Sequence, residues 1–301
     1  MITIIGSGRI GSNVAMQLAL RKLDDISLID VVENLPKGEA LDIGQALPGI
    51  KSNFKIKAGN YDDVKDSEII IITAGFSRKP NETRIDLLKR NLSVIKDICG
   101  KISKNLSNQK IILTSNPVDI LTYATLKILN YKERNVIGMG SLLDSYRFIY
   151  FISLTLNVPI GDIEAMTIGE HGDTMIPLYK RAKVKDKLLT EIADKEKISE
   201  IIKRTRNAGA EIISLKGATF YAPSVAVAET VEAILKDKKE IIPSSVYLEN
   251  YDLCIGFPVK IGRNGVEEII DINFDEEEKN LFEISVKEIK KNIDEIRSLL
   301  S

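Results

Sequence analysis

The chain has 301 residues, and its 42 Lys+Arg and 43 Asp+Glu give a formal net charge of −1. This balance argues against nucleic acid as the main partner, because phosphate binding requires an excess or a patch of basic residues. The two cysteines, Cys99 and Cys254, exclude a disulfide framework, and without a C-x-x-C spacing they disfavour a structural zinc site. The single histidine, His171, excludes a His-ligated zinc site of the usual kind, so imidazole acid–base chemistry must use this residue.

The first half of the sequence alternates short β-rich runs with helical patterns. Amphipathic helices are predicted at residues 10–23 and 84–104, where apolar residues recur with helical spacing. Strands are predicted at residues 1–5, 25–31, 68–73, 110–115 and 135–138. This alternation predicts a doubly wound α/β fold, with parallel strands joined by right-handed helical crossovers.

The second half of the sequence has a different pattern. Helices are predicted at residues 142–156, 198–215 and 224–235, with breaks around Gly217 and Pro223. Strands are predicted at residues 163–168, 245–248, 252–261 and 267–273, and the turn Arg263-Asn264-Gly265 between the last two is typical of a hairpin. A last helix begins at residues 275–278, and its apolar stripe comprises Leu281, Ile284, Ile289, Ile293, Ile296 and Leu300.

The change of pattern falls near residue 140, and the length suits two domains. We therefore expect a cofactor-binding domain at residues 1–140 and an α+β domain with antiparallel strands at residues 141–301. No apolar run approaches the ~20 residues of a membrane span, and the N-terminus has no signal-peptide pattern. These features predict a cytoplasmic protein with reduced, buried thiols and no membrane partner.

A glycine motif follows the first predicted strand and opens the first predicted helix: Gly6-Ser7-Gly8-Arg9-Ile10-Gly11. Its first glycine permits a tight turn, the second lets the backbone approach a pyrophosphate, and the third lets the helix pack against the strand. The anion lies at the helix N-terminus, where N–H groups and the helix dipole favour negative charge. Asp30, at the end of the second strand, would hold the adenosine ribose hydroxyls and repel a 2′-phosphate. The motif predicts a Rossmann domain that binds NAD, with NADP as an alternative cofactor and a ligand-free turn as the structural alternative.

His171 lies in the segment Gly169-Glu170-His171-Gly172-Asp173, directly after a predicted strand. An imidazole that acts as general acid/base needs a partner that fixes its tautomer and stabilises the imidazolium. Asp144 and Arg147 are three residues apart and share one otherwise apolar helix face. We interpret Asp144 as the partner of His171 and Arg147 as a bidentate ligand for a substrate carboxylate. A purely structural histidine and a local helix salt bridge are the alternatives.

A cationic segment follows the isoleucine-rich strand. It holds Arg78, Lys79 and Arg84 within seven residues, together with Pro80 and Asn81. This composition suits a mobile loop over the carboxyl ends of the strands, where ligands of doubly wound sheets bind. A solvated surface loop is the alternative.

Together these segments resemble the lactate/malate dehydrogenase family over almost the whole chain. The glycine motif, Asp30, the cationic loop and the His171 segment match its pattern. Further matching segments are Thr73-Ala74-Gly75, Thr114-Ser115-Asn116-Pro117-Val118-Asp119, Leu143-Asp144-Ser145, Arg147-Phe148 and Lys216-Gly217-Ala218-Thr219.

The resemblance implies that His171 exchanges a proton with the substrate oxygen and that Asp144 is its partner. Arg147 would bind the C1 carboxylate, and Arg84 would polarise the reacting carbonyl from a closing loop. The nicotinamide would supply the hydride chemistry, while the protein supplies position and charge.

The resemblance also implies that Asn116 touches the nicotinamide and the substrate oxygen, and that Thr219 lines the substrate pocket. The implied cofactor site comprises Gly6, Ser7, Gly8, Arg9, Ile10, Gly11, Asp30, Thr73, Ala74, Gly75, Asn91, Ser115 and Asn116.

Arg78 occupies the position where lactate enzymes of this family typically have glutamine and malate enzymes have arginine. Oxaloacetate has a second carboxylate that needs a cation, whereas pyruvate would leave this arginine buried and unpaired. Tyr221-Ala222-Pro223 also resembles the malate branch, while Met139-Gly140-Ser141 and Lys216-Gly217-Ala218-Thr219 are closer to the lactate branch. The chain thus resembles the lactate-dehydrogenase-like malate dehydrogenases, which are usually homotetramers.

The resemblance therefore implies NAD-dependent interconversion of (S)-malate and oxaloacetate, a reaction of the tricarboxylic acid cycle, in a homotetramer rather than a dimer. An L-lactate dehydrogenase and a non-catalytic NAD-binding module are the alternatives. Arg78 disfavours the first, and the set of Asp144, Arg147 and His171 disfavours the second.

Overall fold

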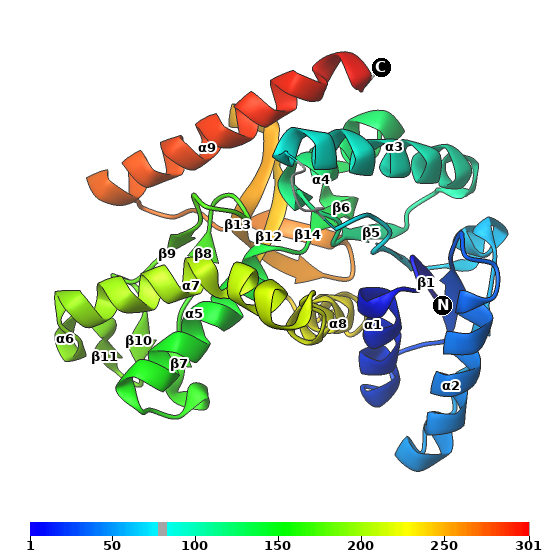
Figure 1. Cartoon of the computed structure of the whole chain (residues 1–301), viewed down its shortest axis with the longest axis horizontal. Coiled ribbons are helices and arrows are strands. Elements are labelled where there is room, and N and C mark those ends of the chain that lie inside the picture. The colour runs from blue at the N-terminus through cyan, green and yellow to red at the C-terminus, as the bar shows by residue number, and fades with distance from the viewer. Residues whose placement is uncertain (78–82, 301) are drawn as a thin grey trace.

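A single sheet runs through both halves of the chain in this computed structural model, which describes residues 1–77 and 83–300 (Figure 1). Within these residues the sheet has nine strands in the order β14-β13-β12-β6-β5-β4-β1-β2-β3. The parallel strands are β1 (Ile2–Ile5), β2 (Ile26–Ile29), β3 (Ile56–Ala58), β4 (Ile69–Ile72), β5 (Lys110–Leu113) and β6 (Val136–Gly138). Their order is that of a Rossmann fold, so the predicted doubly wound fold is confirmed.

The helices between these strands cover both faces of the sheet and bury it. They are α1 (Arg9–Leu20), α2 (Leu35–Ile50), α3 (Arg84–Ile102) and α4 (Val118–Leu129). All four isoleucines of β4 have no exposed surface, as a strand covered on both faces requires. The sequence pattern does not reveal α2, because its glycines and internal proline weaken the helical signal. It also misses α4, which is apolar nearly all round and has no polar stripe.

The second half adds helices and two small sheets. The helices are α5 (Ser141–Leu156), α6 (Leu189–Ile192), α7 (Lys195–Lys216), α8 (Tyr221–Leu235) and α9 (Glu276–Ile296). The short strands are β7 (Ile163–Glu164), β8 (Thr167–Ile168), β9 (Ile176–Pro177), β10 (Lys183–Val184) and β11 (Lys187–Leu188). The single strand predicted at residues 163–168 is wrong, since β7 pairs with β10 whereas β8 pairs with β9, and the chain must redirect between them.

The antiparallel strands of the second half extend the parallel sheet. They are β12 (Glu240–Leu248), β13 (Leu253–Gly262) and β14 (Gly265–Ile269), and β12 pairs with β6 where Ser245 lies opposite Gly138. The predicted hairpin is confirmed: Gly262 pairs with Gly265 across a two-residue turn. Short 3₁₀ helices lie at Tyr61–Asp66, Ser103–Asn105, Glu133–Asn135, Ile160–Asp162, Glu249–Tyr251 and Arg297–Leu299.

Helix α9 lies along one edge of the molecule beside α3 and α4 (Figure 1). Its N-cap, Asp275, accepts a hydrogen bond from the Glu278 N–H, which explains why the helix begins there. The predicted apolar stripe is wrong at Ile284, which is 51% exposed, because Phe282 and Val286 face the core instead. No helix in the described ranges is both long and apolar enough to span a membrane.

Candidate active site

In the glycine loop between β1 and α1, two glycines lie too close to neighbouring backbone for a side chain, and a third borders open space. Gly6 has a φ of +104°, and a Cβ there would lie 2.6 Å from the Ala74 backbone nitrogen. A Cβ on Gly11 would lie 1.8 Å from the Gly6 carbonyl oxygen. Gly8 has no heavy atom within 4 Å of a built Cβ, so its backbone faces open space. The loop is therefore closed toward the protein and open where a ligand could approach the start of α1.

Asp30 lies beside this loop, at the carboxyl end of β2. Its Oδ2 accepts a hydrogen bond from the Ser7 N–H at 2.6 Å, and its Oδ1 accepts one from the Val32 N–H at 2.9 Å. A carboxylate has about four acceptor positions, so two remain for hydroxyl donors. The side chain is only partly buried, which leaves it accessible from the glycine loop.

The ends of β1, β4 and β5 are tied together next to the glycine loop. The Thr73 hydroxyl donates to the Gly6 carbonyl at 2.7 Å, and the Ser115 hydroxyl donates to the Ala74 carbonyl at 2.6 Å. The buried Asn91 side chain accepts from the Phe76 N–H and donates to the Phe76 and Asn116 carbonyls. Asn91 is thus bonded to main chain, whereas Asn116 is exposed.

These loops fit a dinucleotide cofactor. Gly8 is the N-cap of α1 and has no side chain to accept the first helical N–H groups, so these donors can receive a pyrophosphate. Arg9 is exposed at the first helical position, and Ile10 is half-buried behind it. The N–H of Ser7, the residue directly before the open Gly8, donates to the carboxylate of Asp30, so this carboxylate is held next to the glycine loop.

His171 lies in the loop between β8 and β9 and is bonded to helix α5. Its Nδ1 is 2.7 Å from Asp144 Oδ2, and Arg147 Nη1 donates to the other oxygen of Asp144 at 2.9 Å. Asp144 is 1% exposed, so both interactions occur away from water. Burial lowers the pKa of His171, but the charge and hydrogen bond of Asp144 more than offset this, and the net pKa is raised. The hydrogen bonds of His171 within residues 1–77 and 83–300 involve its backbone N–H and Nδ1, so Nε2 remains available as a donor or acceptor.

The guanidinium of Arg147 is only partly hydrogen-bonded to the described residues of the protein. Its side chain is 11% exposed, and its buried Nε has no hydrogen-bond partner within the described residues. A Cβ on Gly209 of α7 would lie 3.2 Å from Nη2, so the glycine makes room for the guanidinium. A buried unpaired donor costs about 1–3 kcal/mol, and an anion can recover this energy. Arg147 is therefore suited to bind a carboxylate.

The cationic loop reaches the histidine loop at one described position. Arg84, the first residue of α3, pairs with Asp173, two residues after His171, and both side chains are exposed. Arg78 lies outside the described residues, as do Lys79, Pro80 and Asn81. Thr219 lies in the segment between α7 and α8 and is half-buried.

Several residues that support the site are not evident from the sequence. A Cβ on Gly140 would lie 2.8 Å from the Cβ of His171, so only glycine fits behind the histidine. The His171 N–H donates to Asp119 Oδ2, and the Glu170 N–H donates to the Ser285 hydroxyl of α9. Asp119 and Gly140 both lie inside segments noted for their resemblance, but nothing in the sequence shows that either one approaches His171.

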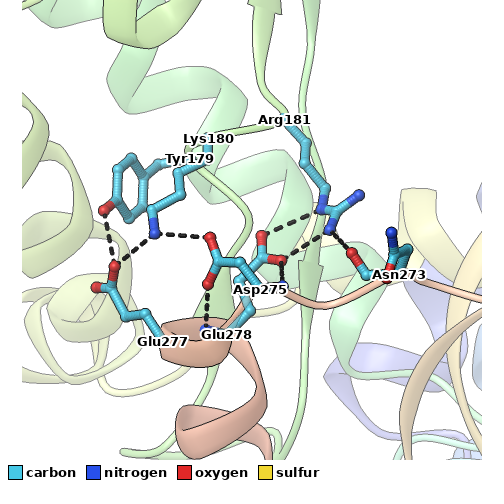
Figure 2. A network of polar contacts seen from close by, with 7 residues as sticks. All are labelled: Tyr179, Lys180, Arg181, Asn273, Asp275, Glu277 and Glu278. Atoms are coloured by element: carbon cyan, nitrogen blue, oxygen red, sulfur yellow. Dashed lines mark hydrogen bonds and ion pairs between the residues drawn. The ribbon is translucent and has the colours of Figure 1, made fainter.

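A charged network anchors the start of helix α9 (Figure 2). Arg181 donates to both carboxylate oxygens of the buried Glu278 at 3.1 and 2.7 Å. Lys180 lies 2.7 Å from Asp275 and 2.6 Å from Glu277. Figure 2 also shows Tyr179 directed toward Glu277 and Asn273 beside Arg181. The network fixes the start of α9 against the chain that follows β9, and Ser285 then reaches the histidine loop from the same helix.

Comparisons with known proteins agree with this arrangement. Residues 1–138 match the description "lactate/malate dehydrogenase, NAD binding domain", and residues 141–300 match "lactate/malate dehydrogenase, alpha/beta C-terminal domain". The chain belongs to the lactate/malate dehydrogenase family.

The individual relatives include proteins named malate dehydrogenase and proteins named lactate dehydrogenase. The malate dehydrogenase of Picrophilus torridus is 40% identical, over 97% of this chain and 95% of its own length. The structure of malate dehydrogenase from Cryptosporidium parvum superposes with a TM-score of 0.95 at 36% identity, covering 99% of this chain and 98% of that one. Lactate dehydrogenase from the same organism gives a TM-score of 0.93 at 33% identity, covering 97% of this chain and 96% of that one. The backbone alone therefore does not distinguish the two substrates.

Proposed function

We propose that this protein is an NAD-dependent malate dehydrogenase that interconverts (S)-malate and oxaloacetate. The observation that carries the proposal is that one buried carboxylate, Asp144, contacts both His171 and Arg147. This arrangement holds a proton-transfer group and a carboxylate-binding group at a fixed separation, as oxidation of a 2-hydroxy acid requires. Relatives named malate dehydrogenase, matched over nearly the full chain, support the choice of substrate.

In the proposed reaction His171 accepts the hydroxyl proton of malate at Nε2 and returns it to the carbonyl oxygen in the reverse direction. Asp144 holds the Nδ1–H tautomer and stabilises the imidazolium that forms. Arg147 binds the C1 carboxylate, and Arg84 stabilises negative charge on the reacting oxygen after leaving Asp173. NAD, when bound, supplies the acceptor for the hydride that leaves the substrate carbon.

The choice of NAD over NADP rests on Asp30. Its carboxylate is held beside the glycine loop by the Ser7 and Val32 N–H groups. A carboxylate in this position can accept hydrogen bonds from ribose hydroxyls, and it repels a 2′-phosphate. Gly8, Thr73, Gly75 and Ser115 would line the remainder of the cofactor site, together with Asn116 on the nicotinamide side.

The choice of malate over lactate rests on Arg78, a residue outside those the structure describes. A cation at this position would pair with the second carboxylate of oxaloacetate, whereas pyruvate would leave it buried without a partner. An L-lactate dehydrogenase is the second candidate, because lactate dehydrogenases also superpose closely. We further assign residues 1–140 to the cofactor domain, residues 141–301 to the substrate domain, and Thr219 to the substrate pocket.

The test compares initial rates with oxaloacetate and pyruvate, each with NADH and NADPH. We expect the largest kcat/KM for oxaloacetate with NADH. Arg78→Gln is expected to move the preference toward pyruvate, while Lys79→Gln, on the neighbouring cation, serves as the matched control. A wild-type preference for pyruvate would overturn the substrate, and binding of NADH without turnover of either keto acid would favour the non-catalytic module.

We also propose a homo-oligomer, with a tetramer favoured over a dimer, acting in the cytoplasm within the tricarboxylic acid cycle. Large apolar side chains exposed on α1, α2 and α8 support association: Leu20, Leu41 and Tyr221 are 46%, 66% and 65% exposed. The unpaired thiols of Cys99 and Cys254 are consistent with a reducing compartment. Light scattering coupled to size-exclusion chromatography measures the assembly, and a monomeric mass would contradict it.

A further inference from the structure

His171 is held by two carboxylates from different helices. Asp144 of α5 binds its ring, and Asp119 of α4 accepts a hydrogen bond from its backbone N–H at 2.7 Å. Asp119 is 2% exposed, so this bond is made inside the protein. The two helices thus fix the main chain and the side chain of the histidine separately.

Asp119 is an unusual choice for a purely structural acceptor. An asparagine or serine oxygen could accept the same backbone hydrogen bond without placing a carboxyl group in the interior. The second oxygen of Asp119, Oδ1, is buried, and the polar side chain that acts on this carboxyl from β12 is the neutral hydroxyl of Ser245, whose hydrogen bond lowers the pKa of Asp119. A buried carboxylate that no cation pairs directly costs stability even when neutral groups hydrogen-bond to it, which is reasonable where its charge is used.

The position of Asp119 links the cofactor side of the site to the histidine. It lies in the first turn of α4, three residues after Asn116, whose carbonyl is fixed by Asn91 at 2.6 Å. The histidine loop is also attached to β13 through Gly169 and Gly256, to α9 through Ser285, to α5 through Asp144 and to α3 through the exposed pair of Asp173 with Arg84. Among these attachments Asp119 comes from α4, the helix that begins directly after Asn116, a residue of the proposed cofactor site.

We propose that Asp119 is a positioning residue for proton transfer: it fixes the main chain of His171, and its negative charge helps Asp144 to stabilise the imidazolium. This inference rests on the proposed function, since it names a further residue of the same reaction. Asp119 does not contact substrate; it acts through His171.

The electrostatic surroundings are consistent with this role. Burial lowers the pKa of His171, the neighbouring Asp144 raises it, Arg147 lowers it, and Asp119 raises it again. Burial raises the pKa of Asp119 to about 6, while the hydrogen bonds from Ser245 and from the His171 N–H lower it and so favour the ionised carboxylate. The titratable and charged groups that face the pair are, from α5, Asp144 and Arg147, from its own loop Glu170, and from β13 Cys254.

The single histidine makes a direct test possible. In tag-free protein, the imidazole NMR signals belong to His171 alone, so their titration reports its pKa without any need for activity. We expect Asp119→Asn, which keeps an acceptor oxygen but removes the charge, to lower this pKa. Ser285→Ala is the matched control, because it removes the acceptor of the adjacent Glu170 N–H without changing charge, and we expect no pKa change. An unchanged pKa in Asp119→Asn, or an equal shift in Ser285→Ala, overturns the electrostatic role.

Kinetics test the positioning role. A displacement of about 1 Å can cost about 10²-fold in rate, so we expect Asp119→Ala to lower kcat with oxaloacetate by about 10- to 100-fold. NADH affinity, measured by fluorescence, should stay within about twofold, and Asp119→Asn should recover most of kcat while moving the pH profile to lower pH. Equal losses in both variants with an unchanged pH profile would show a merely structural role. If the wild type does not reduce oxaloacetate, the proposed function fails, yet the NMR titration still decides whether Asp119 acts on His171.

Discussion

Replacing Arg147 with lysine tests the carboxylate-binding half of the site. The guanidinium donates to Asp144 at 2.9 Å, while its buried Nε has no partner within the described residues. Lysine keeps the positive charge but has a single nitrogen, which cannot bond Asp144 and also present two parallel donors to a substrate carboxylate. Arg147→Lys therefore removes the bidentate contact and retains the charge.

The expected magnitude follows from the bonds lost. One hydrogen bond to a charged group contributes about 1.5–3 kcal/mol. Its loss corresponds to a fall in kcat/KM for oxaloacetate of about 10- to 150-fold. The carboxylate is bound in the ground state and in the transition state alike, so most of the effect should appear as a higher KM.

The assay measures initial rates against oxaloacetate concentration at saturating NADH, with NADH affinity determined separately by fluorescence. Gly209→Ala is a second perturbation of the same group, since its Cβ would lie 3.2 Å from Arg147 Nη2, and a smaller rise in KM is expected. An unchanged KM in Arg147→Lys, or a parallel loss of NADH affinity, would refute the assignment of Arg147 to the substrate carboxylate.

Three further results are expected. Gly8→Ala should leave the melting temperature unchanged and weaken NADH binding, because its Cβ fills the open space proposed for the cofactor. Gly11→Ala should lower the melting temperature, because its Cβ would lie 1.8 Å from the Gly6 carbonyl oxygen. A larger fall in melting temperature for Gly8→Ala than for Gly11→Ala would contradict these roles of the two glycines. His171→Asn should abolish turnover while NADH still binds, and normal turnover would refute its proton role. Hydrogen bonds from Lys236 and Arg21 lower the pKa of the Glu232 carboxyl from 4.5 to about 2. The stabilisation from its charge is therefore present above pH 4.5 and is lost as the pH falls toward 2. Glu232→Gln should accordingly lower the melting temperature near neutral pH and converge with wild type in acid; a difference independent of pH would exclude this linkage.

The sequence was informative where local chemistry dictates local structure. The glycine spacing before α1 is required by the two close approaches at Gly6 and Gly11, so the motif predicts its own geometry. Isoleucine runs predict the buried parallel strands, since β-branched residues favour strands and a strand covered on both faces can bury four of them in succession. Asp144 and Arg147 are predicted to act together because residues three apart share a helix face.

Other features depend on contacts between distant segments. The strand predicted at residues 163–168 divides because its two ends pair with different partners, and Ile284 is exposed because packing, not periodicity alone, orients α9. The hairpin of β13 and β14 shows no local sign that β12 will add to the edge of the parallel sheet. Such pairings are decided by the whole fold.

What the sequence by itself determined is the family, the dinucleotide loop and the one histidine that could be proposed for proton transfer, because each depends on residue types at fixed spacing. What only the tertiary structure decided is how His171 is held: Asp144 at its ring, Asp119 at its main chain and Gly140 behind it come from separate segments. The physical reason is that a spacing rule describes neighbours along one chain segment, whereas a buried ring is oriented by every element that packs around it.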